Sequence, residues 1–304
     1  MSDTISYPLI SIITINYNGL QDTCELIDSL YSCIHSVTYE IIVVDNASEN
    51  QEASVIKQKY PSVNVIESKD NLGFSGGNNL GIRQAKGDFI LLLNNDTLVE
   101  KDGFHQLIET FNQNPSVGMV CPKIRFADDE IIIQYAGYTE LSSITLRNRA
   151  IGLGEKDKGQ YNKCYQTSYV HGAAVMIRKE AINKVGLMPE IFFLYYEEID
   201  WSTSFKEHGY EIWYNGNCTI YHKESQSVGQ ESAMRSYYMM RNRLLYAWRH
   251  KHGWQKWASI IYLMVIAAGK NSMLHISEKK PQLALAIFKG IIAFIFMKNK
   301  LKQQ

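Results

Sequence analysis

Three carboxylates lie among aromatic residues in one short stretch of the chain, FFLYYEEIDWS (192–202). Glu197, Glu198 and Asp200 lie within four consecutive positions there. Acidic residues at a helix start complement the helix dipole, so the stretch is typical of an ordinary helix N-terminus. A carboxylate held against an apolar wall, in contrast, has a raised pKa and can accept a proton near neutral pH. Both interpretations, a helix start and a general base, stay open at this point.

Three further residues that could do chemistry follow apolar runs. Asp45 ends the run EIIVVD and opens an Asp-Asn-Ala-Ser turn, Asp96 follows DFILLLN within two residues, and His222 ends CTIYH. Asp is common in turns and caps, and a single His is more often structural than a ligand. The functional interpretation is that Asp45 accepts hydrogen bonds from a nucleotide, while Asp96 and His222 bind a divalent cation.

Elements that would position these residues alternate along the first third of the chain. Apolar runs rich in Ile, Val and Leu predict buried strands, and mixed segments of helical length separate them. The predicted strands are 9–15, 40–45, 62–67 and 88–94, and the predicted helices are 20–33, 50–60 and 76–86. This alternation predicts an α/β fold with a mainly parallel sheet. Ligands of such sheets bind at the carboxyl ends of the strands, so residues 16–18, 45–48 and 94–97 are expected to form the site.

A glycine-rich segment, 70–88, resembles a dinucleotide loop only superficially. Its glycines do not form GxGxxG, no strand runs directly into it, and no Gly-Lys-Ser/Thr follows. Glycines beside Asn79 indicate either close approach of the backbone to a ligand or a tight entry into a helix.

The second half of the chain is more mixed. The segment 168–178 predicts a strand, 199–209 a helix ended by Gly209, and 210–215 and 218–222 two short strands. The polar, glycine-containing segment 146–167 predicts a mobile loop. From about residue 231 the pattern is helical to the end.

Taken together, these stretches resemble glycosyltransferase family 2, and within it the rhamnosyltransferase-like branch of bacterial surface-polysaccharide enzymes. Each piece is weak alone, but the pieces follow the order of the family across residues 9–229. The matching stretches are SIITINYNG, IIVVDNAS, NLGFSGGNNLGIRQAKGDFILLLNNDT, HGAAVMIRKEAINKVGLMPEIFFLYYEEIDWS and IYHKESQSVG.

The resemblance implies a GT-A fold for residues 1–230, in which one α/β domain binds the nucleotide sugar. It implies that Asp45 contacts the nucleotide. Together with the strand-end rule and the glycine-rich segment, this predicts a set of donor-binding residues. They are Asn16, Asp45, Asn79, Asn95 and Asp96.

The resemblance also implies a divalent metal, Mn²⁺ or Mg²⁺. Asp96 matches the last acid of the family's DxD element and His222 a histidine that completes the metal site in relatives. Asn94 stands where the first acid is expected, so one carboxylate fewer should weaken the metal site. Glu197 and Glu198 fall on the family's acidic pair, whose second member is the expected base; that member is Glu198, while Asp200 either takes part or orients its neighbours.

Charge divides the chain into two parts. Residues 231–304 hold 13 Lys and Arg against two acidic residues, whereas residues 1–230 hold 18 basic and 29 acidic residues. Such asymmetry predicts an anionic partner for the tail. Two apolar segments, 254–268 and 282–297, are each shorter than the roughly 20 residues of a spanning helix. With Trp254 and nearby basic residues they suit an anionic membrane surface; buried core helices or a homo-oligomer contact are the alternatives.

The sequence thus predicts an inverting glycosyltransferase on the cytoplasmic, inner face of the cell membrane. It would transfer a sugar from a nucleotide-sugar donor to a glycan acceptor, lipid-linked in our interpretation. A nucleotidyltransferase and a non-catalytic sugar-nucleotide-binding scaffold are the rival hypotheses. No nucleic-acid motif supports nucleic acid as the partner of the basic tail. The five scattered cysteines, without a CxxC pair, predict reduced thiols, and the N-terminus MSDTISYPL predicts no signal peptide.

Overall fold

A computed structural model describes residues 8–223 and 232–301. The strands are β1 Leu9–Asn16, β2 Thr38–Asp45, β3 Asn64–Glu67, β4 Phe89–Leu93, β5 Thr97–Leu98, β6 Val117–Phe126, β7 Ile133–Tyr135, β8 Cys164–Gln166, β9 Ala174–Arg178 and β10 Glu211–His222. The helices of the body are α1 Leu20–Cys33, α2 Glu52–Lys59, α3 Gly73–Gln84, α4 Phe104–Gln113, α5 Lys179–Val185, the 3₁₀ turn η1 Glu190–Phe192 and α6 Glu197–Glu207. The C-terminal helices are α7 Ala233–His250, α8 Gly253–Ile261, the π-helical η2 Tyr262–Ala267, α9 Ala268–Ser277 and α10 Pro281–Leu301.

One sheet forms the centre of the body, with the strand order β3-β2-β1-β4-β9-β6-β10-β5. The first four strands are parallel, as the alternating pattern predicts, and β9 joins antiparallel to both β4 and β6. Most Ile and Val side chains of β1 and β2 and the Leu side chains of β4 are fully or almost fully buried, because helices cover both faces of a parallel sheet. The sheet therefore brings Asn16 and Asp45 into register as neighbours at their strand ends.

The structure corrects several predicted boundaries. β9 begins at Ala174, so 168–173 is not strand, and the two short strands predicted at 210–215 and 218–222 are one strand, β10. A shift of register between Asn215 and Thr219 lets β10 continue through Gly216. The segment predicted as a mobile loop carries β8 and isolated bridges such as Tyr138–Ala150. All five cysteines are free thiols in the structure.

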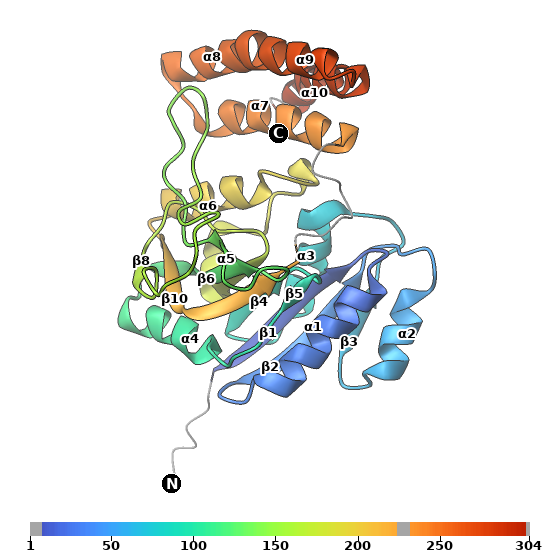
Figure 1. Cartoon of the computed structure of the whole chain (residues 1–304), viewed down its shortest axis with the longest axis vertical. Coiled ribbons are helices and arrows are strands. Elements are labelled where there is room, and N and C mark those ends of the chain that lie inside the picture. The colour runs from blue at the N-terminus through green and yellow to red at the C-terminus, as the bar shows by residue number, and fades with distance from the viewer. Residues whose placement is uncertain (1–7, 224–231, 302–304) are drawn as a thin grey trace.

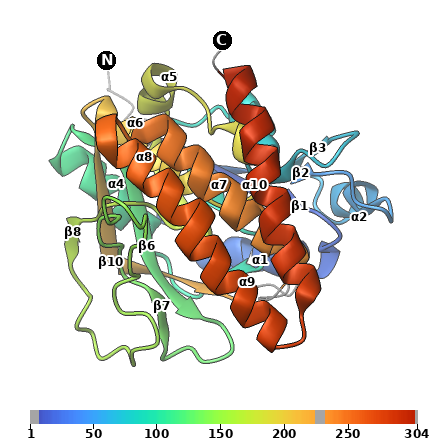
Figure 2. The ribbon, with the colours of Figure 1, turned by 90° about the horizontal axis from the view of Figure 1, so that it is seen from above.

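The C-terminal helices form a layer at one end of the molecule (Figure 1). Seen from above, the continuous helix α8-η2-α9 and the helix α10 lie across α7 (Figure 2). A second hydrophobic cluster joins this layer to the body, since Phe192, Tyr196 and Ile199 pack with Leu244 and Ile287. The division between residues 230 and 231 stays a prediction, but the helical layer shares its core with the body.

The two apolar segments are longer as helices than the sequence pattern indicates. Among the described residues, Gly253–Ser277 and Pro281–Lys298 have the length and composition to cross a membrane. The expectation that neither is long enough is therefore wrong, because the first helix continues through the more polar residues after Ala268. Only 33% and 39% of the two windows are buried inside the structure, so much of both helices is exposed.

Candidate functional site

A hydrogen-bonded cluster lies at the carboxyl ends of β1 and β2, where the nucleotide-sugar donor is predicted to bind. We call this part of the site the donor edge. Asn16 donates from Nδ2 to Asp45 Oδ1 at 2.8 Å and to Glu52 Oε2 at 2.8 Å. Ser48 Oγ donates to Asp45 Oδ1 at 2.6 Å, which fixes the turn after β2. Asn16, Asp45 and Glu52 are all buried. Asn16 and Asp45 thus lie together at the strand ends, as the strand-end rule predicts. The structure adds Glu52 to the cluster, a residue that sequence reasoning missed.

Asn95 lies beside this cluster, and Asn79 does not. Asn95 Nδ2 donates to Thr23 Oγ1 at 3.2 Å, and Thr23 Oγ1 in turn donates to Asn16 Oδ1 at 2.7 Å. Asn79 is fully engaged elsewhere: its amide donates to Met188 O at 2.8 Å and accepts from Met188 N at 3.1 Å. The structure therefore gives Asn79 a visible role in holding the segment before η1, and its contact with donor stays a prediction.

Asp96 and His222 meet as the metal hypothesis requires. β5 pairs antiparallel with β10, which places Thr97 opposite His222, and His222 Nε2 lies 3.2 Å from Asp96 Oδ1. Both residues are buried. The tight turn before β5 is closed by Thr97, whose Oγ1 donates to Asn94 O at 2.6 Å.

The geometry of this pair fits a bound cation. His222 Nδ1 lies 2.8 Å from Gln134 Oε1, so with Gln134 accepting, the proton of a neutral imidazole is on Nδ1. The lone pair on Nε2 then faces the Asp96 carboxylate, and two such electron-rich groups 3.2 Å apart need a proton or a cation between them. Within the described residues no third His, Cys, Asp or Glu joins them. Mg²⁺ is commonly bound by one or two protein ligands together with the phosphates of the substrate.

The acidic stretch is a strained loop that runs into α6. Phe193, Tyr195 and Tyr196 have φ angles of 64°, 68° and 74°, a region that costs non-glycine residues of order 1–3 kcal/mol each. Phe193 O accepts a hydrogen bond from Phe74 N at 2.7 Å, at the start of α3. This close approach requires Gly73, because a Cβ there would lie 2.3 Å from Phe193 O.

Helix α7 holds the loop in this conformation. Asn242 is fully buried, and its Nδ2 donates to the carbonyls of Phe192, Leu194 and Tyr195 at 3.1, 2.8 and 2.7 Å. Neighbouring Arg241 donates from Nη2 to Ile191 O at 3.1 Å. A residue more than 40 positions later in the chain thus fixes the backbone that presents Glu197 and Glu198, a contact for which the sequence offered no signal.

Glu197 and Glu198 begin α6, so the helix-start and base interpretations are compatible. Burial, followed by the charge of Glu198, raises the pKa of Glu197 well above its usual range. Its Oε2 atom is buried and has no hydrogen-bond partner among the described residues, which further disfavours the charged form. Glu198 is only partly buried, and burial raises its pKa to about 7. A carboxyl with this pKa suits the predicted role of Glu198 as a base near neutral pH, and that role stays a prediction.

Asp200 points away from this pair. It is fully buried, and its Oδ1 accepts from Arg249 Nε at 2.8 Å and from His250 Nε2 at 2.7 Å, at the end of α7. Although burial lowers the pKa of His250, hydrogen bonds to Asp200 and Glu207 raise it overall. These contacts make Asp200 a link between α6 and α7, and a catalytic role for it stays a prediction.

A row of aromatic rings leads from His222 to Tyr138. The His171 ring stacks on Tyr138 at 6.0 Å and meets His222 edge-on at 6.2 Å. Burial, followed by the charge of Glu198, raises the pKa of Tyr138. Burial, followed by His222, lowers the pKa of His171 to about 3, so that imidazole is neutral. Sequence reasoning missed Tyr138, His171 and Gln134, which carry no motif of their own.

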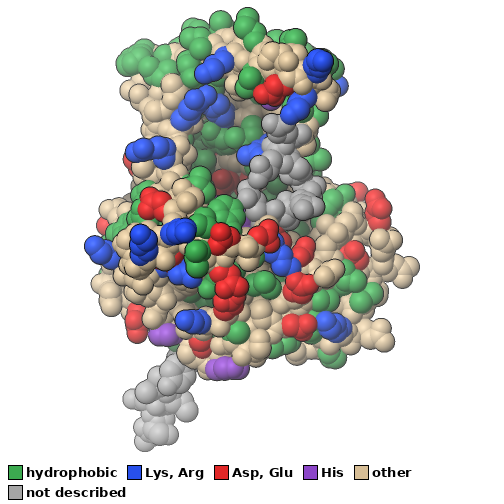
Figure 3. All heavy atoms as spheres, in the orientation of Figure 1, with side chains coloured by type: hydrophobic (Ala, Val, Ile, Leu, Met, Phe, Trp, Pro, Cys, Tyr) green, Lys and Arg blue, Asp and Glu red, His purple; other side chains and the backbone are tan. Residues whose placement is uncertain are grey.

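The surface between the body and the helical layer is hollowed (Figure 3). Hydrophobic and acidic side chains lie inside the hollow, and Lys and Arg side chains gather on the helical layer above it (Figure 3).

Comparisons with known proteins agree with this architecture. A family model described as Glycosyl transferase family 2 matches residues 11–186. The low-salt glycan biosynthesis hexosyltransferase Agl10 of Haloferax volcanii is 30% identical over 249 residues, covering 78% of this chain and 74% of that protein. A poly-beta-1,6-N-acetyl-D-glucosamine synthase of Staphylococcus aureus is 26% identical over 170 residues, which cover 53% of this chain but only 38% of the synthase.

Solved structures share the fold at low sequence identity. The mannosyltransferase PcManGT from Pyrobaculum calidifontis, in complex with GDP-Man and Mn²⁺, superposes with a TM-score of 0.59 at 13% identity, covering 97% of this chain and 89% of that chain. The family model spans more than half of this chain, and the relative from Haloferax volcanii matches 78% of it. The chain therefore belongs to glycosyl transferase family 2 and is a glycosyltransferase with the GT-A fold.

Proposed function

We propose that this glycosyltransferase is an inverting hexosyltransferase that takes a sugar from a nucleotide-sugar donor and adds it to a lipid-linked glycan at the inner face of the cell membrane. Synthesis of a bacterial surface polysaccharide is the process that the resemblance favours, with rhamnose as one candidate sugar. The observation that carries the proposal is the buried pair Asp96–His222 at the strand ends of the sheet, with His222 Nε2 3.2 Å from Asp96 Oδ1, in the same domain as a carboxyl, Glu198, whose pKa burial raises to about 7.

The residues divide the reaction between them. Asp45 and its cluster would bind the nucleoside, while Asp96 and His222 would hold a divalent cation, Mn²⁺ or Mg²⁺, against the diphosphate. A bound cation would offset the negative charge that develops on the leaving nucleoside diphosphate. Glu198 would take the proton of the acceptor hydroxyl as that oxygen attacks the anomeric carbon from the opposite face. The carbon–oxygen bond to the diphosphate breaks, and the anomeric configuration inverts.

The rival functions differ in what they require. A nucleotidyltransferase needs no base for a sugar hydroxyl, so the raised pKa of Glu198 favours sugar transfer. A non-catalytic scaffold needs neither the base nor the buried Asp96–His222 pair. Strained backbone costs stability, and three strained residues beside Glu198 indicate that this loop is kept for its function.

The apolar surface of the helical layer supports the membrane part of the proposal. Exposed side chains recur at helical spacing on both helices: Trp254, Trp257, Ile261 and Val265, then Leu285, Phe288, Ile292 and Phe296. The opposite faces are buried against α7, as at Leu263 and Ile291. Helices that are packed on one side and apolar on the other suit a position in the membrane interface, parallel to its plane.

The test of the function is transfer itself. Purified protein is first screened by thermal shift with UDP-, GDP- and dTDP-sugars and Mn²⁺; a donor at 100 times its Kd should stabilise by about 2.7 kcal/mol. The donor that binds is then incubated with short-chain polyprenyl-diphosphate glycans, and NMR of the product reads the anomeric configuration. Retained configuration would refute the inverting mechanism, and release of pyrophosphate would favour the nucleotidyltransferase.

Membrane attachment has its own test with point variants. Phe288→Ser together with Ile292→Ser should abolish co-sedimentation with anionic liposomes. The control, Ile131→Ser, removes a side chain of similar exposure on the body, 51% against 50% and 54%, and should pellet like the wild type. Equal pelleting of all three proteins would contradict the membrane role.

A further inference from the structure

His171 lies on a backbone segment that is hydrogen-bonded to both predicted parts of the site. On one side, Ala173 O accepts a hydrogen bond at 2.9 Å from Asn94 N, directly after β4. On the other side, Val170 N donates at 3.2 Å to Ser202 Oγ, on the helix α6 that begins with the acidic pair. His171 is therefore held between the carboxyl end of β4 and α6.

The hydrogen bonding of the His171 ring leaves one donor for a ligand. Its Nδ1 atom accepts from Ala173 N at 3.1 Å, so Nδ1 carries no proton and the ring proton is on Nε2. Among the described residues, none bonds Nε2 of His171, and the buried polar atoms without a partner do not include it, so this atom has accessible surface. His171 as a whole is half-buried. The Nε2–H group can therefore donate to a ligand.

The neighbours of His171 hold its ring beside unfilled space. The ring stacks on Tyr138, with centroids 6.0 Å apart and an interplanar angle of 14°, and its centroid lies 5.1 Å from that of Tyr135. The next residue, Gly172, has no side chain: apart from its chain neighbours, a Cβ there would meet only Phe74 Cζ, at 3.9 Å. A donor that is fixed in direction beside such a space is suited to recognise one polar group of a substrate.

The position of His171 favours the transferred sugar as its ligand. The His171 ring meets the His222 ring edge-on at 6.2 Å, so it lies close to the pair that would hold the diphosphate of the donor. In a nucleotide sugar the sugar is bonded directly to this diphosphate. Phosphate oxygens are bound most strongly by the cationic groups of Arg and Lys, whereas a neutral N–H suits an uncharged hydroxyl.

We propose that His171 donates a hydrogen bond from Nε2 to a hydroxyl of the transferred sugar and so helps to select that sugar. The inference rests on the proposed function, because it requires a nucleotide sugar whose diphosphate lies at Asp96 and His222. It adds a specificity-determining contact to that site. A sugar that lacks this hydroxyl would leave the N–H group without an acceptor and would bind more weakly.

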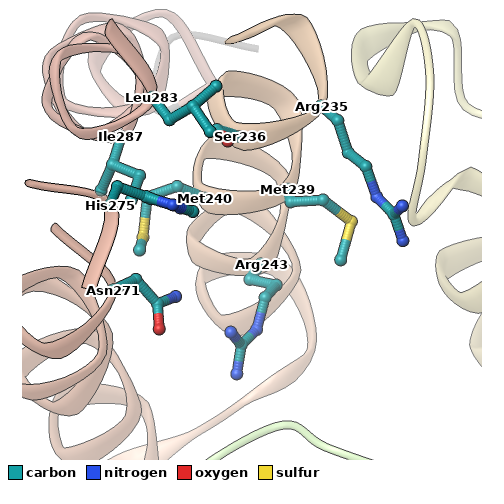
Figure 4. A pocket seen from close by; sticks show the side chains of 9 residues that line it. All are labelled: Arg235, Ser236, Met239, Met240, Arg243, Asn271, His275, Leu283 and Ile287. Atoms are coloured by element: carbon teal, nitrogen blue, oxygen red, sulfur yellow. The ribbon is translucent and has the colours of Figure 1, made fainter. Parts of the chain in front are cut away.

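Two substitutions separate this contact from the structural role of the ring. In His171→Asn the side-chain oxygen takes the place of Nδ1 and can still accept from Ala173 N, but the distal donor is lost. In His171→Gln the side-chain amide reaches the position of Nε2 and supplies a donor again. The control is His275→Asn, because His275 is also half-buried but lines a cavity between α7, α9 and α10 in the helical layer (Figure 4).

Calorimetry in Mn²⁺ compares each nucleotide sugar with its nucleoside diphosphate: UDP-glucose with UDP, GDP-mannose with GDP, and dTDP-rhamnose with dTDP. For the nucleotide sugar that the wild type binds, His171→Asn should weaken binding about tenfold and leave binding of the nucleoside diphosphate unchanged. His171→Gln should recover part of this loss, and His275→Asn should bind both ligands like the wild type. Equal weakening of both ligands by His171→Asn would assign Nε2 to the diphosphate, and wild-type affinity for both would remove it from the donor site. Either result would overturn the proposal.

The calorimetric result is separate from sugar transfer. If the wild type transfers sugar and His171→Asn binds the nucleotide sugar normally, the proposed function stands and this inference fails. If the wild type transfers to no acceptor while His171→Asn selectively weakens the nucleotide sugar, the inference stands and the proposed transfer fails. Binding of no nucleotide sugar by the wild type would overturn both. A series of monodeoxy donors then identifies the hydroxyl: the wild type should bind one analogue about tenfold more weakly than the parent, and His171→Asn should bind the two equally.

Discussion

The donor edge and the acidic loop are held in place in different ways. At the donor edge, the parallel ladder between β1 and β2 sets Asn16 beside Asp45, and the contacts come from residues close to the strand ends. In the acidic loop, the backbone is strained at Phe193 and Tyr195, and side chains of the distant helix α7 hold it. Under the proposed function, changes in the helical layer should impair acceptor activation while donor binding persists.

The largest effect should come from the base itself. Glu198→Gln keeps the size of the side chain and removes proton acceptance, so kcat should fall about 100-fold or more. Donor binding, measured by thermal shift, should stay near the wild-type value because the donor edge is untouched. Glu109→Gln, an exposed residue on α4, is the matched control.

Glu197→Gln sharpens the assignment within the pair. Because burial and the charge of Glu198 raise the pKa of Glu197 well above its usual range, the site favours the neutral carboxyl there, and the neutral amide should replace it at a smaller cost. Wild-type rates for Glu198→Gln, with inactivity of Glu197→Gln, would move the base to Glu197.

Loss of either predicted metal ligand, Asp96 or His222, should weaken the binding of nucleotide sugar. Asp96→Asn and His222→Ala should each remove most of the Mn²⁺-dependent thermal shift with nucleotide sugar, and EDTA should do the same to the wild type. Gln134→Leu, which frees the His222 ring, should weaken metal affinity by roughly 10-fold or more. Asp128→Asn, an exposed acid, should change nothing. Full activity after exhaustive chelation would leave Asp96 and His222 as a structural pair.

A substitution in α7 should lower kcat, as a substitution at Glu198 does, although it leaves the residues of the acidic loop unchanged. Asn242→Asp replaces the donating amide by an oxygen that faces three carbonyls, which should cost about 1–3 kcal/mol of stability. We expect kcat to fall about 10-fold and the KM for donor to stay constant. The pH midpoint of activity should also move, since the surroundings of Glu198 change; a purely structural loss would lower activity without moving it. Asn112→Asp, exposed on α4, is the control.

The sequence predicted the donor edge better than the acidic loop for a physical reason. Strand ends follow from local apolar patterns and topology, so these patterns alone were enough to place Asp45 and Asp96 at one edge of the sheet. Glu52 and Gln134 were missed because their partners are set by packing of segments 36 and 88 residues apart. Asn242 was missed because a buried amide that caps a strained loop leaves no periodic pattern in its own helix.

The smallest expected effect is a difference in pH dependence: kcat should depend on pH through the acidic loop, and donor binding should not. As the proposed base, Glu198 would act only when ionised, and burial raises its pKa from 4.5 to about 7. Relative to the plateau above pH 8, kcat should therefore be about half at pH 7 and fall about tenfold per unit below it. Stability should move the other way: the folded protein holds this proton more tightly than the unfolded chain, so this group's contribution declines as pH rises from 4.5 to about 7. The measurements are kcat at saturating donor and thermal unfolding across pH 5 to 9. A kcat that is flat between pH 6 and 8 would place the base elsewhere, whereas donor binding is expected to show no such midpoint in either case.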